Sequence, residues 1–174
     1  MTLFSKNKLA FLVTLVGLIL ISTSVVNSAT IQIPKDTPVK VKFKQGLRIT
    51  SGEFNKGSVI PITLAQPIDK NGIILVETGA EGTAQVVEIE KAGGNGKPGY
   101  IKIEFVDIKP KGAFSLREGE AIKLEGELVE AKGKGKGFFP WLFLKFILKG
   151  GEAEIATDKV YEVKVAESAM MQSE

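Results

Sequence analysis

The side chains that could carry chemistry in this chain are hydroxyls, carboxylates and amines, because its 174 residues include no histidine and no cysteine. This composition excludes cysteine nucleophiles, histidine-based triads, disulfides and zinc sites built from either residue. A serine beside a lysine could still supply a nucleophile and its base, but lysines are so frequent that such neighbours are expected by chance. The candidate hydroxyls include Ser51, Ser58 and Ser115.

Paired carboxylates are the second kind of candidate. Glu88 and Glu90 lie two residues apart, as do Glu125 and Glu127. On a strand this spacing places both carboxylates on one side, which is typical of a solvent-facing surface. Glycosidases also use two carboxylates, but nothing else in the sequence favours that chemistry. We therefore predict a protein that is not an enzyme and that uses no metal and no cofactor.

The charge of the chain gives no argument for a nucleic-acid partner. Lysine and arginine number 23 against 20 acidic residues, for a formal net charge of +3. Two of the lysines, Lys6 and Lys8, belong to the N-terminal leader, so the remainder carries almost no net charge. No basic field of the kind that attracts a polyanion remains.

Residues 1–28 have the pattern of a secretory signal peptide. Lys6 and Lys8 precede the apolar stretch Leu9–Ile21, and small and polar residues follow it. Val26 and Ser28 are the residues at −3 and −1 that favour cleavage after Ser28. The apolar stretch is shorter than the about 20 residues that a spanning helix needs, and an uncleaved N-terminal anchor is the alternative interpretation. We expect an exported protein, in the periplasm, the cell envelope or the extracellular space.

Residues 29–167 alternate between apolar and polar side chains, which predicts β-strands with one side on a core. Adjacent Val86 and Val87 break the alternation, as a β-bulge does. Asn71-Gly72 is typical of a tight hairpin turn, and Gly93–Gly99 of a longer one. We predict a single all-β domain, a β-sandwich or a small barrel, followed by a flexible tail over 168–174. The clearest alternating segments are Val39–Phe43, Ile101–Phe105, Ile122–Glu125 and Tyr161–Val165.

Residues 132–151 form a basic and aromatic insertion in this pattern. Lysines and glycines alternate up to Gly137, and the apolar segment Phe138–Leu148 then holds four of the ten phenylalanines and the only tryptophan. Pro140 near the start of this segment and Gly150 beyond its end are helix start and stop signals. We therefore predict one short apolar helix, too short to span a membrane.

Two interpretations of this insertion remain open. The segment could lie in the interface of an anionic membrane, or dock to an envelope protein assembly, with its lysines on the charged partner. It could instead plug one end of the β core. A glycan-binding module is the rival function, since exposed aromatic rings stack on sugars. The contact residues under the first interpretation are Lys132, Lys134, Lys136, Phe138, Phe139, Trp141, Leu142, Phe143, Lys145, Phe146 and Lys149.

The order of these motifs resembles a group of uncharacterised exported bacterial β-domain proteins. The order from Ile33 to Gly137 is also distantly similar to the C-terminal β-barrel of TrbI-type conjugation-channel proteins. Either resemblance implies an exported β domain, and neither carries over a catalytic residue. The motifs that carry the first resemblance are Pro34–Val41, Gly57–Ile62, Asn71–Val86, Gly133–Leu148 and Lys149–Asp158.

Overall fold

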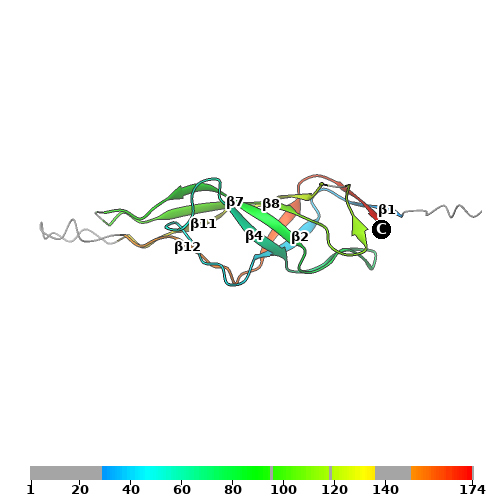
Figure 1. Cartoon of the computed structure of the whole chain (residues 1–174), viewed down its shortest axis with the longest axis horizontal. Helices are drawn as coiled ribbons and strands as arrows, with labels where there is room; N and C mark the ends of the chain where they lie inside the picture. Colours follow the sequence, from blue (N-terminus) through cyan, green and yellow to red (C-terminus); the bar gives the residue numbers. More distant parts are fainter. Residues whose placement is uncertain (1–28, 95, 118, 136–149, 174) are drawn as a thin grey trace, which may run out of the picture.

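The computed structural model describes residues 29–94, 96–117, 119–135 and 150–173, and every regular element in them is a β-strand (Figure 1). Six of these strands close into an antiparallel barrel, because β8 pairs with β7 on one side and with β10 on the other. The predicted all-β, barrel-like domain is confirmed. In order around the barrel the strands are β10 (Ile122–Glu125), β13 (Tyr161–Val165), β2 (Pro38–Phe43), β4 (Val59–Leu64), β7 (Glu81–Glu90) and β8 (Tyr100–Ile108).

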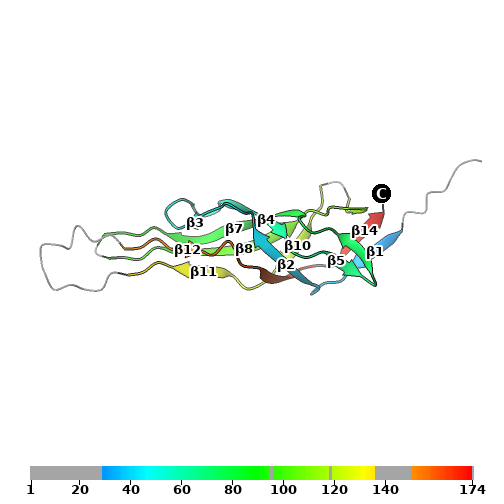
Figure 2. The same ribbon diagram turned by 90° about the horizontal axis from the view of Figure 1, so that it is seen from below.

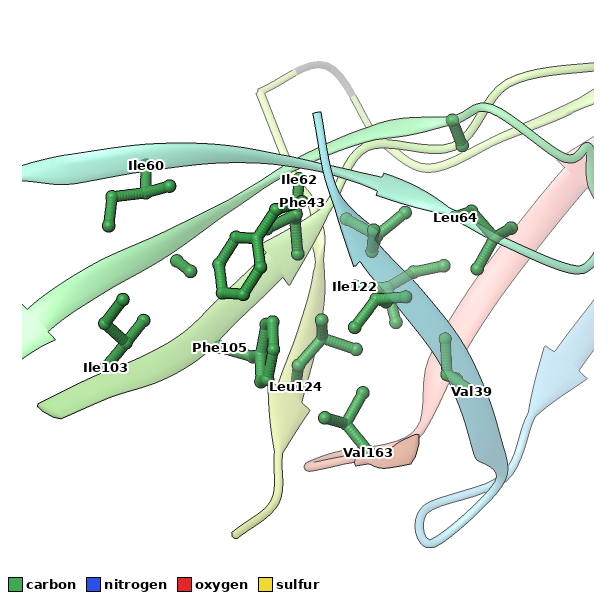
Figure 3. Packing of buried hydrophobic residues seen from close by; sticks show 14 of the residues in the cluster. Val39, Phe43, Ile60, Ile62, Leu64, Ile103, Phe105, Ile122, Leu124 and Val163 are labelled. Atoms are coloured by element: carbon green, nitrogen blue, oxygen red, sulfur yellow. The ribbon is translucent and has the colours of Figure 1, made fainter. Parts of the chain in front are cut away.

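The barrel interior is filled by the apolar members of the alternating segments (Figure 3). In β2, Val39, Val41 and Phe43 are at most 2% exposed, while the lysines between them point outward. The Phe43 ring stacks on Phe105 with centroids 5.7 Å apart and meets Tyr161 edge-on at 5.4 Å. Side chains of a small barrel normally fill its interior in this way.

Strands β7 and β8 are longer than the barrel requires, and their excess length forms an extension that we call the β-arm (Figure 2). It consists of residues 85–90 of β7, residues 100–104 of β8, the added strand β11 (Val129–Lys132) and a small sheet of β3 (Ile49–Thr50) with β12 (Glu154–Ile155). The pairing of β7 with β8 shifts register between Val86 and Glu88, which confirms the predicted bulge.

Two layers give the β-arm an apolar interior of its own. Ile101 and Ile103 of β8 are fully buried, as is Ile49 of β3, and Ile155 of β12 is 4% exposed. All four belong to the same apolar cluster as the barrel interior. Because these four buried residues are continuous with the barrel core, we expect the β-arm to be a rigid projection.

The opposite end of the molecule carries the two chain ends of the β domain (Figure 1). Strands β1 (Thr30–Ile33), β14 (Ala169–Ser173) and β9 (Phe114–Ser115) form a three-stranded sheet in the order β1-β14-β9. Beside it, β5 (Ile68–Lys70) and β6 (Ile73–Val76) form a hairpin. Asn71 and Gly72 both have positive φ between these strands, which confirms the predicted tight turn.

Ala169–Ser173, within the predicted tail over 168–174, form the strand β14. Met171 of this strand is fully buried, and its partner across the ladder is Ile31 of β1. The strand exists because a segment far away in sequence supplies its hydrogen bonds and its apolar contact.

Two other predictions fall on residues that the structure does not describe. These are the signal peptide over 1–28 and the short helix over 138–148. Among the described residues, nothing helical is long and apolar enough to cross a membrane.

Candidate functional site

The end of the β-arm carries the described part of the predicted contact site. Lys132 is the last residue of β11, Lys134 follows it, and both are exposed. The remaining predicted contact residues lie outside the described residues; they are Lys136, Phe138, Phe139, Trp141, Leu142, Phe143, Lys145, Phe146 and Lys149.

The described residues on either side of positions 136–149 meet at the end of the β-arm. Gly151 N–H donates to the Lys134 carbonyl at 3.0 Å, and Gly99 N–H donates to the Gly151 carbonyl at 2.9 Å. Gly133 N–H donates in turn to the Gly99 carbonyl at 2.9 Å. The two boundaries of the insertion are therefore held together, beside the hairpin that joins β7 to β8.

A partly buried polar cluster, which we call the Ser51–Glu152 clamp, fixes one of these boundaries. Ser51 Oγ donates to Glu152 Oε2 at 2.6 Å and accepts from Ala153 N–H at 2.9 Å. Glu152 Oε2 also accepts from Ala92 N–H at 3.1 Å. A Cβ at Gly99 would overlap Ser51 Oγ, so only glycine fits beside the clamp. The clamp ties together three segments that are distant in sequence.

This environment gives Ser51 a structural role. Its side chain is fully buried, and both its donor and its acceptor capacity are used within the clamp. A nucleophilic hydroxyl needs a base within reach and access for a substrate, and a fully buried hydroxyl provides no access. The carboxylates predicted to mark a solvent-facing side, Glu88 and Glu90, are exposed as expected.

The outer face of the β-arm brings together residues that are far apart in sequence. Glu90 of β7, Tyr100 of β8 and Lys132 of β11 stand side by side across the three strands. With Lys97 and Pro98 of the hairpin they line a shallow cavity of about 310 Å³. Lys97 and Tyr100 were not predicted as site residues, because only the pairing of β8 with β11 places them near Lys132.

Two polar contacts order this face. Lys97 Nζ lies 2.9 Å from Glu90 Oε2, and Tyr100 Oη donates to Glu130 Oε2 at 2.8 Å. The hydrogen bond to the Glu130 carboxylate raises the pKa of Tyr100 to about 12, so the phenol is neutral at physiological pH. Lys132 and Lys134 have no ion-pair partner within the described residues, while Glu130 on the same strand keeps its negative charge beside the neutral phenol.

The described residues contain no group of three or more carboxylates close enough together to hold a metal ion. Chemically, the site offers the exposed ammonium groups of Lys132 and Lys134, one tyrosine ring with its hydroxyl and a shallow surface, beside the carboxylates of Glu90 and Glu130 that Lys97 and Tyr100 engage. These groups suit the binding of an anionic surface.

In comparisons with known proteins, no family model, no curated protein and no solved structure matches the chain.

Proposed function

We propose that this protein is an exported, non-catalytic protein of the cell envelope that docks on an anionic membrane surface. The contact consists of the lysines at the end of the β-arm and the aromatic segment Phe138–Leu148. The leader over 1–28 supports export, because it combines two early lysines, an apolar stretch and small residues before Ala29.

The observation that carries the proposal is the meeting of the insertion's two boundaries at the end of the β-arm. Phe105 contributes its ring to the barrel cluster, whereas Tyr100 lies five residues earlier on the same strand. At about 3.4 Å per residue, the contact face is roughly 17 Å from the barrel interior. The apolar side chains of the strands form the cluster in that interior, which favours a contact role for the insertion over a plug.

The energetics of such a contact combine two contributions. Each lysine near an anionic membrane contributes about 1 kcal/mol, and this attraction falls off within a Debye length when salt is added. A large apolar side chain contributes about 1.5–3 kcal/mol if it is fully buried, and salt has little effect on that burial. Tyr100 suits the boundary, because tyrosine places an apolar ring and a polar hydroxyl at the level of the headgroups.

Sedimentation with vesicles of equimolar phosphatidylcholine and phosphatidylglycerol tests the proposal. We expect the triple variant Lys132→Ser, Lys134→Ser, Lys136→Ser to bind about a hundredfold more weakly at low salt, since three lysine contributions are lost. The difference should shrink at high salt.

The matched control removes three exposed lysines of the barrel and of the segment that leads into it, by Lys40→Ser, Lys159→Ser and Lys164→Ser. This variant has the same net charge as the first and should retain most of the binding. If both variants lose the same affinity for vesicles, the overall charge and not the position of the lysines causes the loss. Unchanged binding of the first variant would refute docking through the β-arm.

A further inference from the structure

The sheet at the opposite end of the molecule has one strand edge that is open over part of its length. Ser173 N–H of β14 donates to the Ala29 carbonyl at 3.0 Å, beside β1. Hydrogen bonding alternates along an antiparallel ladder, so the backbone groups of Met171 and Ala169 also face β1. The N–H and C=O of Met170 therefore point away from β1.

On that other side, β14 has a partner only at its C-terminal end, as far as the described residues show. Gln172 and Ser173 pair with Ser115 and Phe114 of β9. If this pairing continued, Arg117 would lie opposite Met170. However, β9 ends at Ser115 and the chain then turns away from β14. Glu120 N–H donates to the Arg117 carbonyl at 2.9 Å in this turn. The N–H and C=O of Met170 are thus left without a strand partner among the described residues.

The divergence of the two segments opens a groove of about 680 Å³. One wall is the outer side of β1 and β14, and the other is formed by the residues around the turn that follows β9. An extended residue in a sheet occupies roughly 160 Å³, from a rise of about 3.3 Å, a strand spacing of about 4.8 Å and a sheet spacing of about 10 Å. The groove therefore has room for about four extended residues.

The opposite edge of the same sheet, on β1, is covered by a lysine side chain. On β1, Gln32 points its C=O away from β14, and Lys70 Nζ of β5 donates to that carbonyl at 2.9 Å. A lysine over a strand edge is a common protection against pairing with another chain. The Met170 edge has no such cover among the described residues.

The side chains around the groove favour a peptide over a polyanion. Met170 is 53% exposed, and Leu116, Ala121 and Ala169 add apolar lining. The charged lining residues are of both signs: Arg117 and Lys123 against Glu120 and Glu167. Lys123 is already 3.4 Å from Asp107, which leaves the acidic residues in excess.

We propose that this groove binds an extended peptide segment of a partner protein, with apolar side chains at alternate positions. The segment adds as a strand to β14 and exchanges hydrogen bonds with the backbone of Met170. This site lies at the opposite end of the molecule from the β-arm, so it is independent of membrane docking (Figure 2).

The test uses random peptides displayed on phage, selected on the immobilised protein, and then measures the affinity of the selected peptides for three variants. Met170→Pro removes the N–H that faces the groove but leaves the ladder to β1 intact, because Ala169 and Met171 make those bonds. It should weaken binding about tenfold or more, through the lost hydrogen bond and the blocking proline ring.

Two control variants separate backbone pairing from other effects. Met170→Ala keeps the N–H and loses only the side chain, so Met170→Pro should bind about tenfold or more weakly than Met170→Ala. Gln32→Pro places the same ring on the opposite edge of the sheet and should leave affinity unchanged. Failure to select any peptide, or equal affinity for Met170→Pro, would overturn the proposal.

Amide hydrogen exchange provides a readout that needs no variant. In the free protein the Met170 amide should exchange fast while those of Ala169 and Met171 are protected, and a selected peptide should protect Met170 as well. A Met170 amide that stays fast in the presence of saturating peptide would equally overturn strand addition.

Discussion

Replacing Ser51 with alanine should lower the free energy of unfolding by about 3 kcal/mol, although the change removes a single oxygen atom. Two contacts of that oxygen set the magnitude. Its bond to the Glu152 carboxylate is charge-assisted, worth about 1.5–3 kcal/mol. The Ala153 N–H that it accepts would be left buried without a partner, at a cost of about 1–3 kcal/mol. Relaxation of the site should offset part of the sum.

Urea denaturation followed by circular dichroism measures this loss as a lower midpoint at an unchanged slope. The matched control is Ser58→Ala, whose Oγ accepts from Asn55 N–H in an exposed turn at 3.1 Å. Loss of that exposed contact should cost about 0.5 kcal/mol or less. If Ser51→Ala costs no more than Ser58→Ala, the clamp does not hold the base of the insertion.

Three further predictions concern packing, ionisation and processing. Gly82→Ala should lower the free energy of unfolding by about 1–3 kcal/mol, because the added Cβ would overlap the Asp107 carbonyl and lie 2.7 Å from Ile108 Cδ1. The control Gly94→Ala, with open space around the added Cβ, should be neutral in the same urea titration. Tyr100 should ionise near pH 12 in a spectrophotometric titration, and Glu130→Gln should move the pKa of Tyr100 down toward 10. Because the folded state favours the neutral phenol, the hydrogen bond stabilises the fold fully below about pH 10, and this stabilisation is lost as the pH rises through about 12. An unchanged Tyr100 pKa in that variant would contradict the hydrogen bond. Mass spectrometry of the exported protein should show an N-terminus at Ala29, and an intact Met1 or Thr2 would refute cleavage.

Strands with strict alternation could be predicted from the sequence, because their pattern is local. Segments such as Val39–Phe43 and Tyr161–Val165 place every second side chain in the core without reference to any distant residue. The Asn71-Gly72 turn and the bulge at Val86 are likewise encoded within a few residues. Whether the strands form a barrel or a sandwich depends on the pairing of β8 with β10, which the alternation does not specify.

The features that could not be predicted depend on contacts between distant segments. β14 has little alternating signal, and its pairing with β1 joins the two ends of the β domain. At the candidate site, Lys97 and Tyr100 reach Lys132 only through the register of β8 with β11. The Ser51–Glu152 clamp joins residues 101 positions apart, with no local motif at either residue.

Trp141 offers the most direct measurement of membrane docking, because it is the only tryptophan of the chain and lies within the proposed contact segment. Its fluorescence should be recorded while vesicles of equimolar phosphatidylcholine and phosphatidylglycerol are titrated into the protein. Docking predicts that the emission maximum moves to shorter wavelength as the ring enters the bilayer interface, and that added salt raises the lipid concentration needed. An emission maximum that stays fixed at saturating lipid would contradict docking through this segment.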